Sequence, residues 1–394
     1  MKEDWKECKL GDVVEINQNS FSEKENWLFV NYLDTGSITE NKISEIQYIN
    51  LIDEKLPSRA KRKVKKNSII YSTVRPNQKH FGIIKSFPEN FLVSTGFAVL
   101  DVNKKLAFPD FVYYYLIQNE NTESLHAIAE QTTSAYPAIK PSDIADISIN
   151  LPPLATQQKI AQILSSLDDK IELNNKINDN LEQQAQAIFK SWFVDFEPFG
   201  GKMPEGWRIG KLSEIADIIM GQSPDGKSYN EDGIGTVFYQ GRAEFGTRFP
   251  TRRLFTTEPK RIAKKFDTLM SVRAPVGDTN IANEDCCIGR GLAAIHSKDR
   301  NQSFIHYTVL FLRSKLDVFN GEGTVFGCIN RDALNNMEVI IPSKIDLDKF
   351  EKIVTTMDTD IFNRSEENDR LKNIRDTLLP KLMNGEIEVD EVKV

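Results

Sequence analysis

The most regular hydrophobic pattern of the chain lies in residues 157–193. Apolar residues recur there at alternating spacings of four and three, the heptad pattern of a helix that packs along one stripe. The stretch contains no Gly or Pro, and a helix of this length would extend for about 55 Å. Such a helix cannot bury its stripe against itself, so the pattern predicts a partner helix. The residues that we expect to face the partner, called the seam below, are Ile160, Leu164, Leu167, Ile171, Asn174, Asn178 and Leu181.

A second stretch, 190 residues further along the chain, has a matching pattern. The spacing is kept without a gap from residue 350 to residue 378, and both stretches carry polar residues in the middle of the seam. A polar layer in an apolar seam usually costs stability and fixes register or orientation. We therefore predict that the two helices pack as an antiparallel coiled coil. The alternative is two unrelated amphipathic helices. The second set of seam residues is Phe350, Val354, Met357, Ile361, Arg364, Asn368 and Leu371.

Short blocks outside the helices also repeat, which indicates an internal duplication. The segment from Trp5 to Ile16 resembles the segment from Trp207 to Ile218. The strand-like segment 67–76 resembles 267–275, so that Arg75 matches Arg273. Further matches pair Gly96 with Gly291, 110–116 with 303–310, and 139–144 with 329–334. Residues 19–66 and 220–265 share little.

The repeat predicts two mixed, strand-rich globular regions, each followed by one long helix. We place the first globular region at 1–150 and the second at 203–340. The first long helix and a linker then occupy 151–202, and the second long helix with a tail occupies 341–394. The linker, residues 195–206, is rich in Gly and Pro. The predicted fold class is α+β, with an internal pseudo-twofold repeat.

Composition is that of an ordinary globular protein, with 40% hydrophobic and 27% charged residues in a chain of 394. No apolar run approaches the length of a membrane span, and the charged start is unlike a secretory signal. The four cysteines form no CxxC pair. We therefore expect a cytoplasmic protein with neither a disulfide framework nor a zinc site.

Positive charge is segregated, although the net charge is −7. Residues 55–66 carry seven basic side chains and no acid, and residues 242–265 carry eight basic and two acidic side chains. These segments are called the first and second basic islands. A single island is usually a solvated surface loop. Two islands at matching places in a duplicated chain favour binding to a polyanion such as DNA.

Candidate DNA-contacting residues combine the islands with polar residues of nearby loops. Arg and Lys bind phosphates, and Arg, Gln, Asn and Ser can reach base edges. Core packing is an equal alternative for Tyr239, and a buried structural role is an equal alternative for Arg75 and Arg273. The candidates of the first half are Arg59, Lys61, Arg62, Lys65, Lys66, Ser72, Arg75, Asn77 and Lys79. Those of the second half are Gln222, Ser223, Tyr239, Gln240, Arg242, Arg248, Arg252, Arg253 and Arg273, with the arginines of 242–253 preferred.

No catalytic motif is recognisable in the sequence. There is no GxxxxGK[ST] phosphate loop, no HExxH, and no carboxylate cluster typical of a nuclease. The Pro152-Pro153 pair lacks the polar and aromatic neighbours of the loop with which amino-methyltransferases hold a flipped base. We predict a non-catalytic chain with no cofactor and no metal of its own.

These features together resemble the specificity subunits of type I restriction-modification systems. The resemblance covers essentially the whole chain. It is strongest in the segment from Leu151 to Ile160, in the helix end at 189–193, and in the segment from Leu378 to Glu386. Residues 221–224 and 271–277 resemble framework pieces of one common type of target-recognition domain. The first half departs from that pattern at 72–76, and the second helix lacks a preceding Leu-Pro-Pro.

The resemblance implies two target-recognition domains that each read half of a bipartite site in double-stranded DNA. The long helices would be spacers that dock two methyltransferase subunits, which hold S-adenosylmethionine. A restriction and translocase subunit would join for cleavage. Two rivals remain at this stage: a scaffold of two globular regions on a coiled coil without DNA, and an enzyme whose motif is not recognised.

Replacing the polar seam residues Asn174, Asn178, Arg364 and Asn368 by Leu tests the coiled coil. The variant is expected to have a higher Tm, because apolar residues pack the seam better, and to populate wrong registers, because the polar layer is gone. Calorimetry and size-exclusion chromatography measure the two effects. A lower Tm without new oligomers would contradict the prediction.

Overall fold

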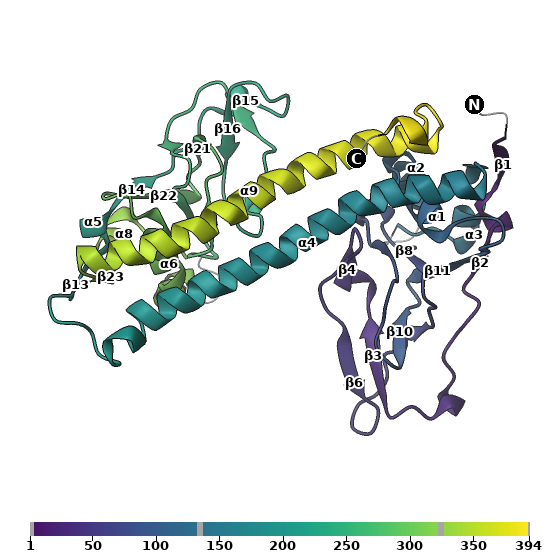
Figure 1. The fold of residues 1–394 in the computed structure, drawn as a ribbon, viewed down its shortest axis with the longest axis horizontal. Coiled ribbons are helices and arrows are strands. Elements are labelled where there is room, and N and C mark those ends of the chain that lie inside the picture. Colours follow the sequence, from purple (N-terminus) through teal and green to yellow (C-terminus); the bar gives the residue numbers. More distant parts are fainter. Residues whose placement is uncertain (1–3, 132–136, 322–326, 393–394) are drawn as a thin grey trace. The chain divides into compact units, whose positions relative to one another are not determined.

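The computed structural model describes residues 4–131, 137–321 and 327–392. The chain forms two compact units. The first unit comprises residues 1–172 and 368–394, and the second comprises residues 173–367. Both units contain parts of two long helices, α4 (Leu154–Phe193) and α9 (Lys344–Met383) (Figure 1). The compact units thus divide each helix, whereas the sequence-based division assigned each helix to a region of its own.

The first unit contains two four-stranded sheets and two two-stranded ribbons, β1–β12 and β4–β5, among its described residues. The strand order is β2-β11-β8-β9 in one sheet and β6-β3-β10-β7 in the other. All four residues of β8 are buried, as are all four of β10, because each strand lies between covered faces. The strands are β1 (Lys6–Lys9), β2 (Val14–Ile16), β3 (Phe29–Leu33), β4 (Ile38–Thr39), β5 (Lys42–Ile43), β6 (Gln47–Asn50), β7 (Ala60–Arg62), β8 (Ile69–Ser72), β9 (Phe81–Ile83), β10 (Phe91–Ser94), β11 (Phe97–Val102) and β12 (Ser148–Leu151).

The second unit repeats the two larger sheets, one of them with an added edge strand. Its sheets have the orders β14-β22-β19-β20 and β15-β17-β16-β21-β18. The strands are β13 (Arg208–Lys211), β14 (Ala216–Met220), β15 (Tyr229–Asn230), β16 (Thr236–Tyr239), β17 (Phe255–Thr256), β18 (Ile262–Ala263), β19 (Thr268–Ser271), β20 (Thr279–Ile281), β21 (Cys286–Ile288), β22 (Leu292–Ser297) and β23 (Glu338–Ile341).

The duplication extends to individual backbone pairings. The β3–β10 pair and the β16–β21 pair are both parallel, while their sheet neighbours are antiparallel. The ribbon β1–β12 corresponds to the ribbon β13–β23. Residues 19–66 and 220–265, which look unrelated in sequence, therefore supply equivalent strands of the second sheet in each unit.

One predicted match is shifted by one residue. The amides of Thr73 and Val272 donate equivalent hydrogen bonds to Gly96 and Gly291, which makes Thr73 and Val272 equivalent. The amides of Arg75 and Ala274 donate to the carbonyls of Pro137 and Gly327 in the same way. Arg75 therefore corresponds to Ala274, and the predicted equivalence of Arg75 with Arg273 is wrong.

Short helices and 3-10 turns connect the strands of each unit. In the first unit these include α1 (Pro109–Leu116), α2 (Asn119–Glu130) and α3 (Pro141–Ala145), together with the 3-10 turns η1 (Leu10–Asp12), η3 (Thr35–Ser37) and η4 (Pro76–Gln78). In the second unit they include α5 (Leu212–Ile215), α6 (Gln302–Phe311), α7 (Arg313–Leu316) and α8 (Arg331–Asn335), with the turn η7 (Arg242–Glu244).

The main core of the first unit joins the sheet, α1 and both long helices. Ile160 and Leu164 of α4 and Leu382 of α9 are at most 1% exposed and belong to one cluster with α1. Arg375 Nη1 donates to Asp168 Oδ1 at 2.7 Å, which pairs the two helices at a second point. Residue numbers increase along α4 in the direction in which those of the contacting residues of α9 decrease, so the helices run antiparallel.

The core of the second unit is built around Phe189 of α4. Its ring lies 5.9 Å from that of Phe350 of α9 and 5.0 to 6.2 Å from three rings of α6. Further along, Asn174 Nδ2 donates to Glu367 Oε2 at 2.8 Å, and Asn178 Nδ2 donates to Ser365 Oγ at 3.3 Å. The helices are again antiparallel, and the predicted polar residues lie between them.

Most seam residues lie where the heptad pattern puts them. Asn174 is fully buried although it is polar, and Arg364 Nη1 donates to its Oδ1 at 3.3 Å. Asn178, Leu181, Met357, Arg364 and Leu371 are half-buried. The buried members are Ile160, Leu164, Leu167, Ile171, Asn174, Phe350, Val354, Ile361 and Asn368.

Each unit ties one of its short helices to a long helix through a Tyr–Asp pair with a cation. In the first unit, Tyr114 Oη of α1 donates to Asp168 Oδ2 at 2.6 Å, and Arg375 supplies the cation. In the second unit, Tyr307 Oη of α6 donates to Asp358 Oδ1 at 2.9 Å. Asp168 and Asp358 are 190 residues apart, the same offset as the seams.

The second long helix contains a proline near its end. The helix continues through Pro380 to Met383. A proline so close to the end removes only one hydrogen bond of the last turns, and Leu379, Leu382 and Met383 are buried. Gly385, whose φ of +66° is readily adopted by glycine, follows the helix end.

Phe189→Ala tests the aromatic core of the second unit. Removing a fully packed ring is expected to lower the free energy of unfolding by about 3–5 kcal/mol. Leu173→Ala on the same helix is the control, because Leu173 is 52% exposed, and should cost less than about 0.5 kcal/mol. Denaturant unfolding of both variants measures the difference. Equal effects would contradict the assignment of Phe189 to the core.

Candidate nucleic-acid interface

Three segments converge at strand ends in the first unit, after β3, β8 and β10. Both the amide and Oγ1 of Thr73, after β8, donate to the carbonyl of Gly96. A Cβ on Gly96 would lie 2.8 Å from Thr35, after β3, so the backbones approach closely there. Loops held at the ends of adjacent strands form a rigidly supported surface suited to recognition.

The second unit has a corresponding junction at the ends of β14, β16 and β21, built more tightly from glycines. A Cβ on Gly221 would lie 2.1 Å from the carbonyl oxygen of Gly289, and one on Gly291 would lie 2.9 Å from that of Gln240. The side chains at this junction are therefore carried by three backbones in direct contact. We call the two junctions, one in each unit, the strand-end clusters.

The first basic island borders the first cluster. Arg59, Lys61 and Lys66 are exposed and form no ion pair within the described residues. Arg59 lies close to Tyr32 at the end of β3: burial raises the pKa of Tyr32 to about 12, and the Arg59 cation opposes that rise. Arg62 is half-buried, and Lys65 pairs with Asp101 at 3.1 Å.

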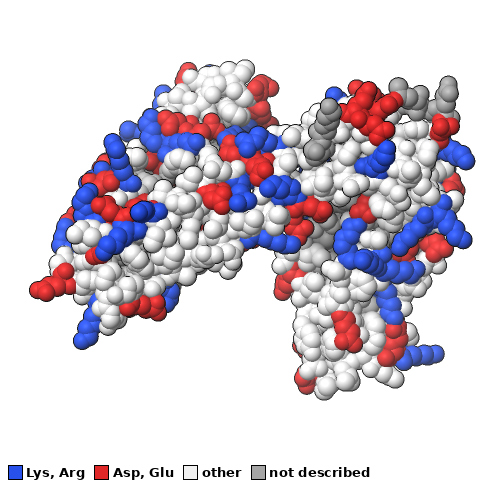
Figure 2. Space-filling view, viewed as in Figure 1, with Lys and Arg blue, Asp and Glu red and all other residues white. Residues whose placement is uncertain are grey.

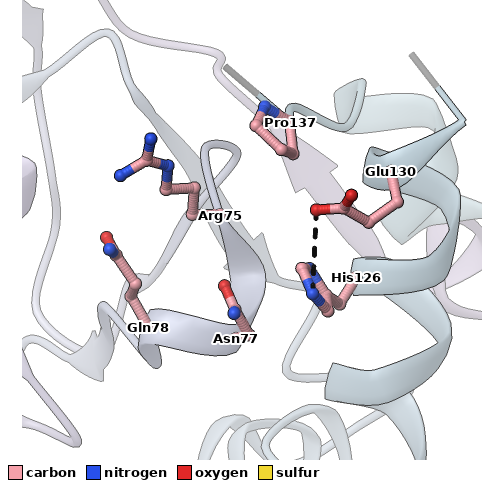
Figure 3. A pocket seen from close by; sticks show the side chains of 6 residues that line it. All are labelled: Arg75, Asn77, Gln78, His126, Glu130 and Pro137. Atoms are coloured by element: carbon pink, nitrogen blue, oxygen red, sulfur yellow. Dashed lines mark ion pairs between the residues drawn. The ribbon is translucent and has the colours of Figure 1, made fainter. Parts of the chain in front are cut away.

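A polar pocket adjoins this cluster (Figure 3). It has a volume of about 340 Å³ and brings together Arg75, which precedes the η4 turn, Asn77 and Gln78 of that turn, and His126 and Glu130 of α2. Arg75 and Asn77 are predicted site residues. Lys79, also predicted, is half-buried and pairs with Glu40 at 3.1 Å. The pocket offers hydrogen-bond donors and acceptors at the edge of the cluster, which suits contact with a base edge or a phosphate.

The second cluster carries several exposed predicted residues. Gln222, Gln240 and Arg273 are exposed around the glycine junction. Ser223 is half-buried, and its Oγ accepts a hydrogen bond from the amide of Arg290 at 3.3 Å. Arg290 is exposed between Gly289 and Gly291, and the sequence reasoning missed it. An Arg flanked by glycines after a buried strand is the signal that could have found it.

The second basic island is largely neutralised by ion pairs. Arg242 pairs with Asp278, Arg252 with Glu284 and Glu366, Arg253 with Glu231 and Glu244, and Lys264 with Asp285. On the face shown in Figure 2, basic and acidic atoms alternate over the second unit. Most of these acids lie outside the island in the sequence, so a count of the island's own charges does not include them. The island is therefore a weaker electrostatic attractor for DNA than its sequence suggests.

Three predicted contact residues lie in the interior. Ser72 is 2% exposed and bonds to the backbone of Val74. Tyr239 is fully buried, and its Oη donates to Asn283 Oδ1 at 3.0 Å. These two side chains cannot reach DNA without a rearrangement of their unit, and they are removed from the candidate set.

Arg248 is the third predicted contact residue that lies in the interior, since it is only 9% exposed. Its guanidinium forms ion pairs with Glu182 of α4 and Asp358 of α9, and Nη1 donates to Tyr307 Oη at 3.2 Å. Burial and the nearby Arg248 cation lower the pKa of His306 well below its ordinary range, so this histidine is neutral. Arg248 is held in a buried network, where desolvation has been compensated by two carboxylates.

The described residues also bound what else the chain can do. None of their His, Cys, Asp and Glu side chains form a group of three or more that could hold a metal ion. Their helices include none with the length and hydrophobicity needed to cross a bilayer. All four cysteines are free thiols.

The comparison with known proteins agrees with the duplicated fold. The family model of the type I restriction modification DNA specificity domain matches twice, over residues 2–183 and 204–373. The type I restriction enzyme HindI specificity subunit of Haemophilus influenzae is 30% identical over 98% of this chain and all of its own length. The putative MjaX specificity subunit of Methanocaldococcus jannaschii is also 30% identical, over 98% of this chain and 94% of its own.

A solved structure shares the fold. The type I restriction-modification S subunit from M. genitalium aligns over 96% of both chains with a TM-score of 0.60 at 18% identity. The family model matches twice, and two relatives at 30% identity are covered almost completely. The alternative of a scaffold that does not bind DNA is therefore unsupported. The chain belongs to the family of specificity subunits of type I restriction-modification systems.

Proposed function

We propose that this chain reads a bipartite site in double-stranded DNA, with one unit on each half-site. The observation that carries the proposal is that the strand-end cluster occurs once in each unit on the same topology. Around it, the first unit exposes Arg59, Arg75 and Asn77, and the second exposes Gln222, Gln240 and Arg273. One scaffold with two sets of side chains is what two different half-sites require.

The long helices would set the gap between the half-sites. Each is a single α-helix with residues in both units. A stiff connection makes half-site spacing a geometric constant. It also raises the effective concentration of the second reader once the first is bound.

The same helices would dock partner subunits. Leu173, Ile353 and Ile374 lie outside the seam and are 52%, 42% and 47% exposed. Exposed apolar side chains on a helix favour a protein partner. We propose two methyltransferase subunits, which would hold S-adenosylmethionine, and a restriction and translocase subunit, with this chain itself non-catalytic.

A map of methylated adenines in the source cell's DNA, with and without the gene, tests the function. Loss of methylation at a single two-part motif with a fixed unspecified gap is the expected result. An unchanged map in cells where the methyltransferase is active would contradict the proposal. Complementation with the intact gene is the control.

The two basic islands should differ in their salt dependence. Changing Arg59, Lys61 and Lys66 to Ala is expected to reduce the slope of log affinity against log salt by up to about 3, because each phosphate contact adds about 1. Arg252→Ala with Arg253→Ala should still weaken binding, but should change the slope by less than about 1, because carboxylates already neutralise both side chains. Binding titrations at several salt concentrations measure both. A larger slope change in the second variant would reverse this assignment.

A further inference from the structure

Residues 246–253 of the second unit form a segment that we call the strap. It follows the η7 turn, which leads away from the strand-end cluster. Its inner edge is fixed to β20: the amide of Ile281 donates to the carbonyl of Arg248 at 2.8 Å, and the Asn280 side chain exchanges two hydrogen bonds with the backbone of Gly246. The strap is thus fixed to the edge of the sheet β14-β22-β19-β20.

Its outer edge lies on the long helices. Arg248 is the central contact, because its buried guanidinium pairs with Glu182 of α4 and with Asp358 of α9, the latter at 2.5 Å. A single side chain from the strap therefore contacts both helices. A buried cation held by two carboxylates has little freedom to move, since leaving either one would strand a charge away from water.

Two further contacts extend along α9. The ring of Phe249 lies 5.6 Å from that of Phe362 in an edge-to-face arrangement. Arg252 lies 3.4 Å from Glu366. Asp358, Phe362 and Glu366 follow one another at intervals of four, so they form one stripe of the helix. This stripe is distinct from the seam residues Phe350, Val354, Met357 and Ile361.

The first unit has no such arrangement among its described residues. The corresponding loop after β3 bonds to β9 and to Lys79: the amide of Asn41 donates to Phe81, and that of Glu40 donates to Lys79. The Tyr–Asp pair of the first unit takes its cation from Arg375 of α9, whereas the second unit takes it from the strap. The cation thus has a different origin in two otherwise equivalent sites.

We propose that Arg248 is a positioning residue for half-site spacing. It holds the strap, and with it the loop that carries Gln240, in place on α4 and α9, the helices that would separate the half-sites. The inference rests on the proposed bipartite reading. The chain from Gln240 in the cluster to Arg248 on the helices is short and passes through the η7 turn. The strap therefore fixes where the loop with Gln240 lies relative to α4 and α9. Arg248 itself does not touch DNA.

The experiment compares the full-length chain with Arg248→Met, on duplexes that carry the mapped motif with its native gap and with gaps changed by one base pair. A one-pair change displaces and rotates a half-site by about 3.4 Å and about 35°. The wild-type chain should prefer the native gap. Arg248→Met should lower that preference about tenfold, the size of a typical coupling between sites, while the sequence preferred at each half-site stays the same.

Salt dependence separates positioning from direct contact. If Arg248 bound a phosphate, Arg248→Met would reduce the salt slope by about 1. The proposal expects an unchanged slope. A reduced slope in the folded variant would overturn it, and so would an unchanged preference for the native gap.

Arg375→Met is the matched control, because it removes the cation from the equivalent Tyr–Asp pair without touching a recognition loop. It should lower stability and keep the gap preference. Equal loss of gap preference in both variants would show a general loosening and overturn the proposal. Phe362→Ala is the second variant if Arg248→Met does not fold, and a smaller loss of gap preference is expected from it. A wild-type chain with no preference for the bipartite motif would instead contradict the proposed function, before any variant is compared.

Discussion

The structure depends on the pairing of two helices that are each too long for one compact unit. An exposed apolar stripe on a helix of 40 residues would favour aggregation, and the antiparallel partner removes most of it from water. Because the partners are antiparallel, the beginning of α4 meets the end of α9 and the end of α4 meets the beginning of α9. Each unit therefore receives one segment of each helix, and each unit's core includes both.

The same pairing explains why the two units can differ so much on their reading side. The sheet next to the helices is constrained by the pair, and its strands remain alike in sequence as well as in topology. The second sheet lies outside this constraint. It keeps its strand order and its one parallel pair, while residues 19–66 and 220–265 have little sequence in common. The strand order of the second sheet is kept because it depends on backbone pairing, whereas the outward-facing side chains of these residues differ between the units.

The sequence reveals most of this fold but less of the candidate site. Heptads are readable because their spacing is local, and the repeat is readable because its blocks are contiguous. Arg248 was misplaced because its acidic partners, Glu182 and Asp358, are distant in sequence, and a local count of charges sees neither. Arg75 and Arg273 were paired because both precede a proline closely, and only hydrogen bonds reveal the shift of one residue. Arg290 escaped because a single Arg between glycines carries no periodic signal.

The division of the helices between the units has a consequence for biosynthesis. The second unit is one continuous stretch, residues 173–367, whereas the first is assembled from residues 1–172 and 368–394. A ribosome thus finishes every residue of the second unit before it supplies Leu379, Leu382 and Met383 to the core of the first. Until then the nascent first unit has an open apolar face along α4. The half of the protein that is made first is the half that is completed last.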